Sequence, residues 1–188
     1  MNNVKKLIVS ALFAALCLVS TAFLAFPLPT GYANLGDCFA FMSGFVLGMP
    51  WGMAAAGIGC ALADLVSGYA VYIPATALLK ALIALAGAVS ARLIFRRGSR
   101  SVMRMLTVIG SSLIGEMIMV LGYFAYECFV IGVGAAAVAS VPANVGQAVV
   151  GVAASAVIAE VFVKNRVLSG LVSSNFAEKT NDRRKGEG

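Results

Sequence analysis

The chain has 188 residues, of which 61% are hydrophobic and only 12% are charged. Soluble domains carry about 25% charged residues, so this chain has too few polar side chains to cover the surface of a water-soluble globule. The composition therefore excludes an ordinary soluble protein and predicts an integral membrane protein. Lys and Arg number 14 against 8 Asp and Glu. We expect this excess to orient the protein in a membrane, and we expect no nucleic-acid partner.

Six apolar segments are long enough, or nearly so, to cross a hydrocarbon core of about 30 Å. In lipid the backbone polar groups of each segment must be satisfied internally, and the alternating pattern of a membrane β-barrel is absent. The sequence therefore predicts an all-α integral membrane protein, a six-transmembrane-helix bundle. We expect one membrane domain over residues 1–168 and a polar cytoplasmic tail over residues 169–188 that is disordered. The predicted spans are 7–26, 35–49, 51–67, 74–95, 102–128 and 141–163.

The second and third spans are shorter than the others and are joined only by the turn at Met49, Pro50 and Trp51. Two short apolar segments connected so closely are compatible with two separate crossings. They are equally compatible with one re-entrant hairpin that enters and leaves on the same side.

The distribution of basic residues predicts the orientation of the bundle, because Lys and Arg near span ends are retained in the cytoplasm. If both termini are cytoplasmic, all but one of the 14 basic residues fall on the inner side, and the three outer loops contain none. We interpret the arginines between the fourth and fifth spans as a topology signal that also contacts anionic membrane lipids. The inner residues are Lys5, Lys6, Arg92, Arg96, Arg97, Arg100, Arg104, Lys164, Arg166, Lys179, Arg183, Arg184 and Lys185.

Several kinds of chemistry have no residues to support them. The chain contains no histidine, and Cys17, Cys38, Cys60 and Cys128 lie in different spans without C-x-x-C spacing, so we expect neither a metal nor a disulfide. It has no phosphate-binding loop, serine nucleophile elbow or H-E-x-x-H motif. We therefore predict that the protein is not an enzyme and binds no cofactor. The first apolar segment is longer than a signal-peptide core and is interpreted as a retained helix.

The charged residues that topology does not explain are the candidates for function. Ionisable groups inside a span are costly and usually face a partner or a wet cavity. Lys80, Asp37, Asp64 and Glu127 all map to the outer half of the predicted bundle. Amides and aromatic residues map to the same half, so the sequence predicts a polar, tyrosine-rich chamber open to the outside. These additional residues are Tyr32, Tyr69, Tyr72, Tyr123, Tyr126, Asn144 and Gln147.

Helical spacing supports part of this chamber and leaves alternatives open. Glu116, Tyr123 and Glu127 fall within about 40° of one another on the fifth span. Asp64 and Lys80 could instead form a buried ion pair that fixes helix register and binds nothing. The outer tyrosines could belong to the interfacial aromatic belt. Glu160 is placed outside the chamber, in a surface pair with the residue four positions later.

Small residues form smooth faces on two of the predicted helices, which permits close approach of another helix. On the first span, Ala11 and Ala15 form a small-xxx-small motif that suits either internal packing or contact with another protein. On the third span we expect internal packing, through the stripe formed by Gly52, Ala56, Gly59 and Ala63.

One group of motifs within residues 31–87 consists of the run from Gly31 to Asp37, Gly48-Met49-Pro50-Trp51-Gly52, the run from Gly57 to Asp64, Gly68-Tyr69, Pro74-Ala75-Thr76 and Lys80. Taken together, these motifs resemble the substrate-binding S components of energy-coupling factor (ECF) vitamin transporters. The similarity extends more loosely to the whole six-helix chain.

The resemblance implies a partner complex made of a transmembrane T component and two cytoplasmic ATPases, in the plasma membrane of a bacterium. It implies that Ala11 and Ala15 dock on the T component and that the S component topples in the membrane to release its vitamin inside. It also implies an outer binding site, in which Asn34, Asp37, Lys80, Glu127, Asn144 and Gln147 are ligand or gate candidates.

A polar aromatic heterocycle suits the predicted chamber. Within the family this indicates a pyrimidine precursor of thiamine, a pyridoxine-type vitamer or riboflavin. Two functions of other classes remain open: a self-sufficient ion-coupled carrier of small solutes, and a structural membrane subunit. The predicted substrate contacts are Tyr32, Asn34, Asp37, Asp64, Tyr72, Lys80, Tyr123, Glu127, Asn144 and Gln147.

Overall fold

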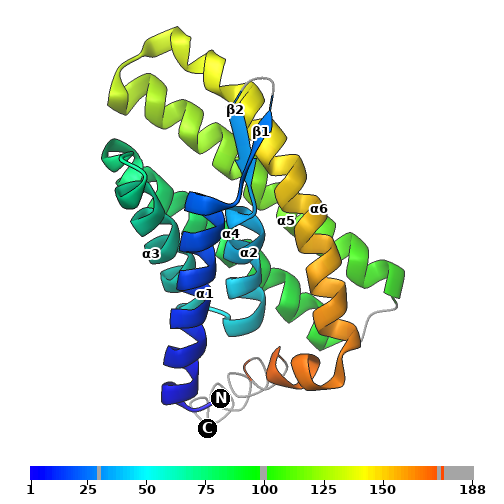
Figure 1. Cartoon of the computed structure of the whole chain (residues 1–188). Coiled ribbons are helices and arrows are strands. Elements are labelled where there is room, and N and C mark those ends of the chain that lie inside the picture. Colours follow the sequence, from blue (N-terminus) through cyan, green and yellow to red (C-terminus); the bar gives the residue numbers. More distant parts are fainter. Residues whose placement is uncertain (29–30, 98–100, 173–174, 176–188) are drawn as a thin grey trace, which may run out of the picture.

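The computed structural model of the chain is a helical bundle with one short β-hairpin near one end (Figure 1). It describes all residues except 29–30, 98–100, 173–174 and 176–188. The α-helices are α1 (Asn3–Phe23), α2 (Gly36–Leu47), α3 (Trp51–Val66), α4 (Ile73–Arg97), α5 (Ser101–Ala125) and α6 (Val141–Lys164). The hairpin is formed by β1 (Ala25–Leu28) and β2 (Gly31–Asn34), and short helical segments of other types are η1 (Ala70–Tyr72), η2 (Tyr126–Ile131) and η3 (Gly134–Ser140).

Among the residues that the structure describes, four helical segments are long and apolar enough to cross a membrane, which agrees with the predicted class of an all-α membrane protein. These segments are Asn3–Phe23, Ala70–Phe95, Ser101–Ile131 and Gly134–Lys164. Helices α2 and α3 are apolar but shorter, with 12 and 16 residues. At 1.5 Å of rise per residue, α2 is only about 18 Å long, which is less than the thickness of the hydrocarbon core.

The first span was predicted to continue as a helix to residue 26, and this boundary is wrong. Helix α1 ends at Phe23, and the next residues form the antiparallel hairpin, in which Ala25 pairs with Asn34 and Leu28 pairs with Gly31. Pro27 lies within β1 and cannot donate a backbone hydrogen bond to a continuing helix. The hairpin therefore replaces the last turn of the predicted helix and lies over one end of the bundle, beside α6 (Figure 1).

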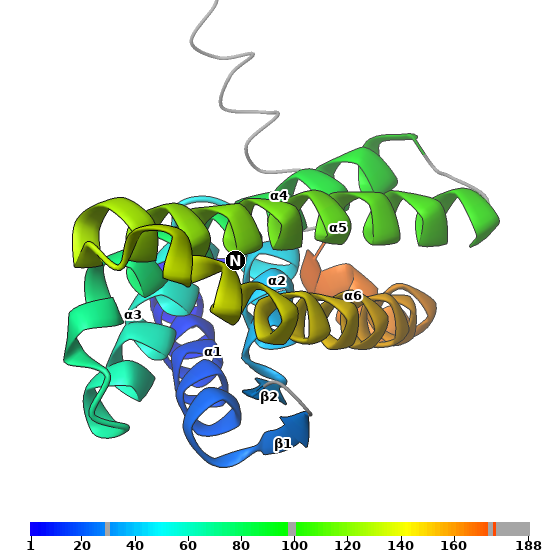
Figure 2. The same cartoon turned by 90° about the horizontal axis from the view of Figure 1, so that it is seen from above.

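Helix α2 is the centre of the bundle. Eleven of its residues are buried, and it contacts α1, α3, α4 and α6. The view from above shows α2 enclosed by these helices (Figure 2). The C-terminal end of α2 is also covered, because the Asn175 side chain donates a hydrogen bond of 2.8 Å to the Val46 carbonyl and Val172 is fully buried in the core. A short helix without a lipid-facing side is thus held entirely by its neighbours.

Glycines set how closely α2 approaches α4. A β-carbon at Gly44 would lie 1.6 Å from the Ala84 carbonyl oxygen, and one at Gly87 would lie 2.0 Å from the Phe41 carbonyl oxygen. Both distances are far below van der Waals contact, so the two helix backbones touch directly. The small-residue stripe predicted on α3 also packs internally, since β-carbons at Gly52 and Gly59 would meet backbone atoms of α2 and α1.

We expect Gly44→Ala to lower the free energy of unfolding by about 1–3 kcal/mol, the usual cost of overpacking a core. The added methyl group would meet rigid backbone and not a mobile side chain. Thermal unfolding of the purified protein in detergent measures the effect. Gly110→Ala is the matched control, because no heavy atom lies within 4 Å of a β-carbon at that position. Equal stability of the two variants would contradict the close contact.

The start of α1 and the end of α6 lie at the end of the bundle away from the hairpin (Figure 1). Glu160 on α6 pairs there with Lys164 over 3.4 Å, as predicted, and also with Arg104 on α5 over 3.7 Å. Residues 166–172 form a further helical segment, so the first residues of the predicted tail are ordered as helix. Residues 173–174 and 176–188 of that predicted tail lie outside the described residues.

The two alanines of the small-xxx-small motif on α1 face away from the bundle. Ala11 and Ala15 are both exposed, whereas Phe13 and Cys17 on the same helix are buried. The α1 backbone approaches α3 at Ala14, which lies opposite Gly59. The motif is therefore not used for packing within this chain, which leaves its smooth face open to another molecule.

Candidate functional site

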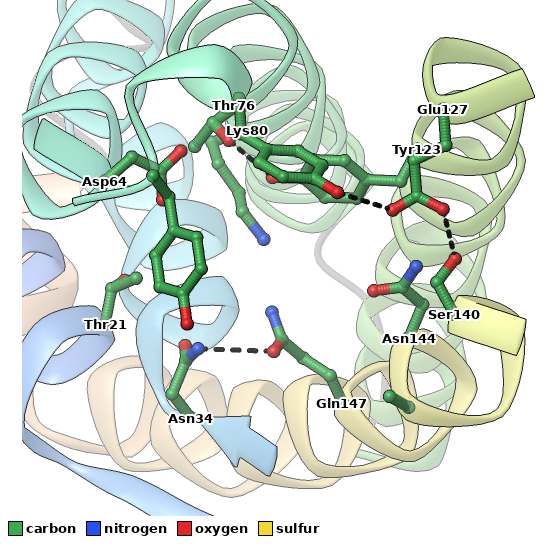
Figure 3. A pocket seen from close by; sticks show the side chains of 13 residues that line it. Thr21, Asn34, Asp64, Thr76, Lys80, Tyr123, Glu127, Ser140, Asn144 and Gln147 are labelled. Atoms are coloured by element: carbon green, nitrogen blue, oxygen red, sulfur yellow. Dashed lines mark hydrogen bonds between the residues drawn. The ribbon is translucent and has the colours of Figure 1, made fainter. Parts of the chain in front are cut away.

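A polar pocket of about 280 Å³ lies beside the end of the hairpin, between α4, α5 and α6 and the ends of α1 and α3 (Figure 3). Helix ends and loops bring its residues together: Thr21 comes from the end of α1, Asn34 from the end of β2, and Asp64 from the end of α3. The pocket is lined by Thr21, Asn34, Asp64, Tyr69, Tyr72, Thr76, Lys80, Tyr123, Glu127, Ser140, Ala143, Asn144 and Gln147.

Lys80 and Asp37 form a buried ion pair at the base of the pocket. The Lys80 ammonium donates to Asp37 Oδ1, and the two side chains are 3% and 0% exposed. The other carboxylate oxygen, Oδ2, accepts a hydrogen bond of 2.6 Å from the Gln147 amide nitrogen. The alternative ion pair between Lys80 and Asp64 is wrong, because the close approach of α2 and α4 places Asp37 against Lys80 instead.

Gln147 also connects the ion pair to the hairpin. Its amide oxygen accepts a hydrogen bond of 3.2 Å from the Asn34 side-chain nitrogen (Figure 3). The Asn34 side-chain oxygen accepts a 2.8 Å bond from the Gly36 backbone N–H, which fixes Asn34 at the start of α2. Hairpin, α6 and α2 thus meet through three side chains: Asn34, Gln147 and Asp37.

Aromatic rings form the wall opposite α6. Tyr72 packs edge-on against Tyr123 with ring centroids 6.2 Å apart, and against Tyr69 at 6.4 Å. The Lys80 nitrogen lies 5.7 Å from the centroid of the Tyr123 ring, within reach of a cation–π contact. The Tyr123 hydroxyl shares a 2.8 Å hydrogen bond with Thr76. This network holds the rings in fixed orientations around a polar interior.

The two acidic residues that line the pocket, Asp64 and Glu127, differ in their hydrogen-bond partners. Glu127 accepts hydrogen bonds from the Tyr72 hydroxyl at 3.2 Å and from the Ser140 hydroxyl at 2.6 Å, so both of its oxygens are engaged. Asp64 has a buried oxygen, Oδ2, that finds no hydrogen-bond partner within the described part of the chain. A carboxylate with an uncommitted buried oxygen is an acceptor available to a bound molecule.

A family model, described as "ECF-type riboflavin transporter, S component", matches residues 1–165. The chain belongs to this family of ECF transporter S components. No curated protein and no solved structure matches the chain. The resemblance drawn from the sequence is thereby confirmed, and the chain is placed among the binding components of membrane transporters for vitamins and not among enzymes.

The pocket of this S component contains most of the side chains predicted from the sequence. Asp37 does not line it but lies beneath it, as the partner of Lys80. The side chain of Tyr32 is outside the described part of the structure. The predicted residues that do line the pocket are Asn34, Asp64, Tyr72, Lys80, Tyr123, Glu127, Asn144 and Gln147.

Sequence reasoning did not select Thr21, Thr76, Ser140 or Ala143 of this S component. Hydroxyl and methyl side chains are frequent in apolar helices and in loops, so their presence carries no signal on its own. Thr76 lies one helical turn before Lys80 on α4, at a spacing of four residues. That spacing is the one feature of the sequence that could have placed Thr76 beside Lys80.

Proposed function

We propose that this S component captures a flat, polar heteroaromatic vitamin in the pocket beside the end of the hairpin, with riboflavin as the first candidate. The observation that carries the proposal is the pocket itself, where tyrosine rings surround a lysine ammonium, an acceptor carboxylate and side-chain amides. The description of the matching family favours riboflavin. A pyridoxine-type vitamer and a pyrimidine precursor of thiamine are the other candidates.

The pocket offers both donors and acceptors to such a ring. An ammonium group has three hydrogens, so the bond from Lys80 to Asp37 leaves donors that can point to a ligand. The Lys80 amine is directed toward the open middle of the pocket (Figure 3). Asp64 supplies an acceptor at the α3 side, and Asn144 supplies an amide at the α6 side. The aromatic faces would then stack on or beside the heterocycle.

The proposal includes six membrane crossings, both termini in the cytoplasm, and a pocket that opens outward in a bacterial plasma membrane. The distribution of Lys and Arg supports this orientation, since Lys5 lies in the first turn of α1 and Lys164 ends α6, and both of these helix ends lie away from the hairpin (Figure 1). Membership in the family implies a T component and ATPases as partners. Two cytoplasmic ATPase subunits would drive release, through toppling of the S component on the T component.

The proposal is tested by titrating the purified protein in detergent with riboflavin, pyridoxine and an aminopyrimidine alcohol. Isothermal titration calorimetry measures the binding of all three compounds, and quenching of riboflavin fluorescence gives an independent measurement for riboflavin. Saturable binding of one compound with a stoichiometry of one supports the proposal. Absence of binding by all three, from protein that unfolds cooperatively, would contradict it.

Asn144→Ala is expected to weaken binding of the preferred vitamin about tenfold, equivalent to one lost hydrogen bond. Asn144 lines the pocket and is not part of the network around Asp37 and Glu127, so its removal should leave the fold intact. Asn165→Ala, at the end of α6, is the matched control and should bind normally. Equal affinities of the two variants would exclude Asn144 from the contact surface.

A further inference from the structure

Glu116 is a buried carboxyl that the proposed vitamin pocket does not use. It lies on α5, is 0% exposed and is not among the residues that line that pocket. Neither of its carboxyl oxygens has a hydrogen-bond partner in the described part of the protein. A buried carboxylate normally has donors or a coordinated cation, because an isolated charge in an apolar interior is very costly. The position therefore needs a partner of some kind.

The packing of α5 against α6 makes room for this carboxyl. A β-carbon at Gly151 on α6 would lie 2.3 Å from Glu116 Oε1 and 3.1 Å from Asp37 Cβ. Only the absence of a side chain at Gly151 lets the carboxyl enter between α6 and α2. Gly151 thus lies against both the Glu116 carboxyl and the first turn of α2.

The neighbouring donors bond to Asp37 and not to Glu116. The Lys80 ammonium donates to one oxygen of Asp37 and the Gln147 amide donates to the other. On its other side Glu116 borders a groove between α5 and α6 whose remaining lining residues are apolar. The pair of Asp37 and Lys80 is electrically balanced. An ionised Glu116 would add one uncompensated negative charge beside that pair.

Two buried hydroxyls lie one helical turn from this carboxyl and from the glycine opposite it. Ser112 precedes Glu116 by one turn on α5, and Ser155 follows Gly151 by one turn on α6. Both side chains are fully buried, and neither hydroxyl has a nitrogen or oxygen partner in the part of the chain that the structure describes; the Ser155 hydroxyl donates to the Cys38 thiol, which leaves its oxygen free to accept. Side chains in helices lean toward the N-terminus, which directs Glu116 toward the level of Ser112 and Ser155 toward the level of Gly151.

We propose that Glu116, Ser112 and Ser155 form a binding site for one small monovalent cation, with sodium as the ion that fits best. Hard cations take oxygen ligands, and this cluster presents two carboxylate and two hydroxyl oxygens that accept no hydrogen bond from the described residues. A proton on Glu116 would also remove the charge, but it engages one of these oxygens, whereas a coordinated cation engages several. The site is separate from the vitamin pocket and does not depend on the proposed function.

Binding of ²²Na⁺ to the purified full-length protein in detergent tests the site, together with thermal unfolding in NaCl against N-methylglucamine chloride at equal ionic strength. We expect one sodium per chain and a saturable rise of the melting temperature with sodium. Glu116→Gln keeps the shape and removes the charge. It should abolish ²²Na⁺ binding and make the melting temperature independent of sodium.

Ser112→Ala and Ser155→Ala should each weaken sodium binding at least tenfold while the protein stays folded. Ser10→Ala is the matched control, because Ser10 on α1 is also buried with an unpartnered hydroxyl but lies on a helix that does not contribute to the cluster. The proposal is overturned if the wild-type protein binds no ²²Na⁺. It is also overturned if Glu116→Gln binds sodium as the wild type does, or if the melting temperature responds to pH and not to sodium.

Discussion

Replacement of Lys80 by methionine is expected to reduce the free energy of unfolding by about 3–5 kcal/mol and to abolish vitamin binding. The loss of stability arises because Asp37, which is 0% exposed, would remain as a buried carboxylate without its counter-ion. The loss of binding arises because the ammonium that faces the pocket is gone. Thermal unfolding and vitamin titration measure the two effects on the same sample.

The double variant Asp37→Asn with Lys80→Met separates these two effects. It removes both charges, so most of the stability should return, while vitamin binding should stay lost. Lys164→Met is the matched control: Lys164 pairs with Glu160 but is 67% exposed, and such surface pairs contribute at most about 1 kcal/mol. Full binding by the double variant would exclude Lys80 from vitamin recognition, and wild-type stability of Lys80→Met would contradict the buried ion pair.

Replacement of both Ala11 and Ala15 by tryptophan is expected to abolish ATP-driven vitamin uptake while vitamin binding remains normal. Both alanines are exposed on α1, and their small size leaves a smooth surface on which another helix can lie closely. Two bulky rings would block that approach without entering the bundle. Uptake is measured in cells that express the S component together with the T component and the ATPases, and binding is measured on the purified variant.

Ile114→Trp is the matched control for this experiment, because Ile114 is 60% exposed on α5, away from α1. It should transport normally. Undiminished uptake by the double variant would exclude the α1 surface as the docking site. Uptake that continues without the ATPases would instead favour a self-sufficient carrier.

The all-α membrane class predicted from hydrophobicity agrees with the structure, but the hairpin does not follow from hydrophobicity. The segment from Ala25 to Leu28 is apolar, and a short apolar run can be read as the end of a helix or as a strand. Its partner strand is Gly31 to Asn34, and hydropathy does not detect this pairing. Apolar periodicity therefore predicts which segments are buried and leaves their local geometry undecided.

The partner of Lys80 shows a second limit of the sequence. Asp37 and Asp64 both occur in the outer half of the predicted bundle. Helical spacing predicts on which face of its own helix each aspartate lies, but it does not predict which other helix packs against that face. The choice is made by Gly44 and Gly87, which let α2 and α4 approach until Asp37 reaches Lys80. Only part of the stripe predicted on α5 belongs to the pocket: Glu116 and Tyr123 are both buried, but Tyr123 lines the pocket and Glu116 does not. Its position opposite Gly151 depends on the packing of α6.

The orientation of the Gln147 amide has a consequence for cooperativity. Its oxygen accepts a hydrogen bond from Asn34 of the hairpin strand, and its nitrogen donates one to Asp37. The two hydrogen bonds therefore run in the same direction, from the hairpin to the carboxylate. A solute that draws the Lys80 ammonium away from Asp37 leaves that carboxylate more dependent on Gln147, and a more strongly polarised amide binds Asn34 more tightly. A solute bound at Lys80 and the contact between Gln147 and the hairpin strand would therefore strengthen each other through charge, without a hinge between them.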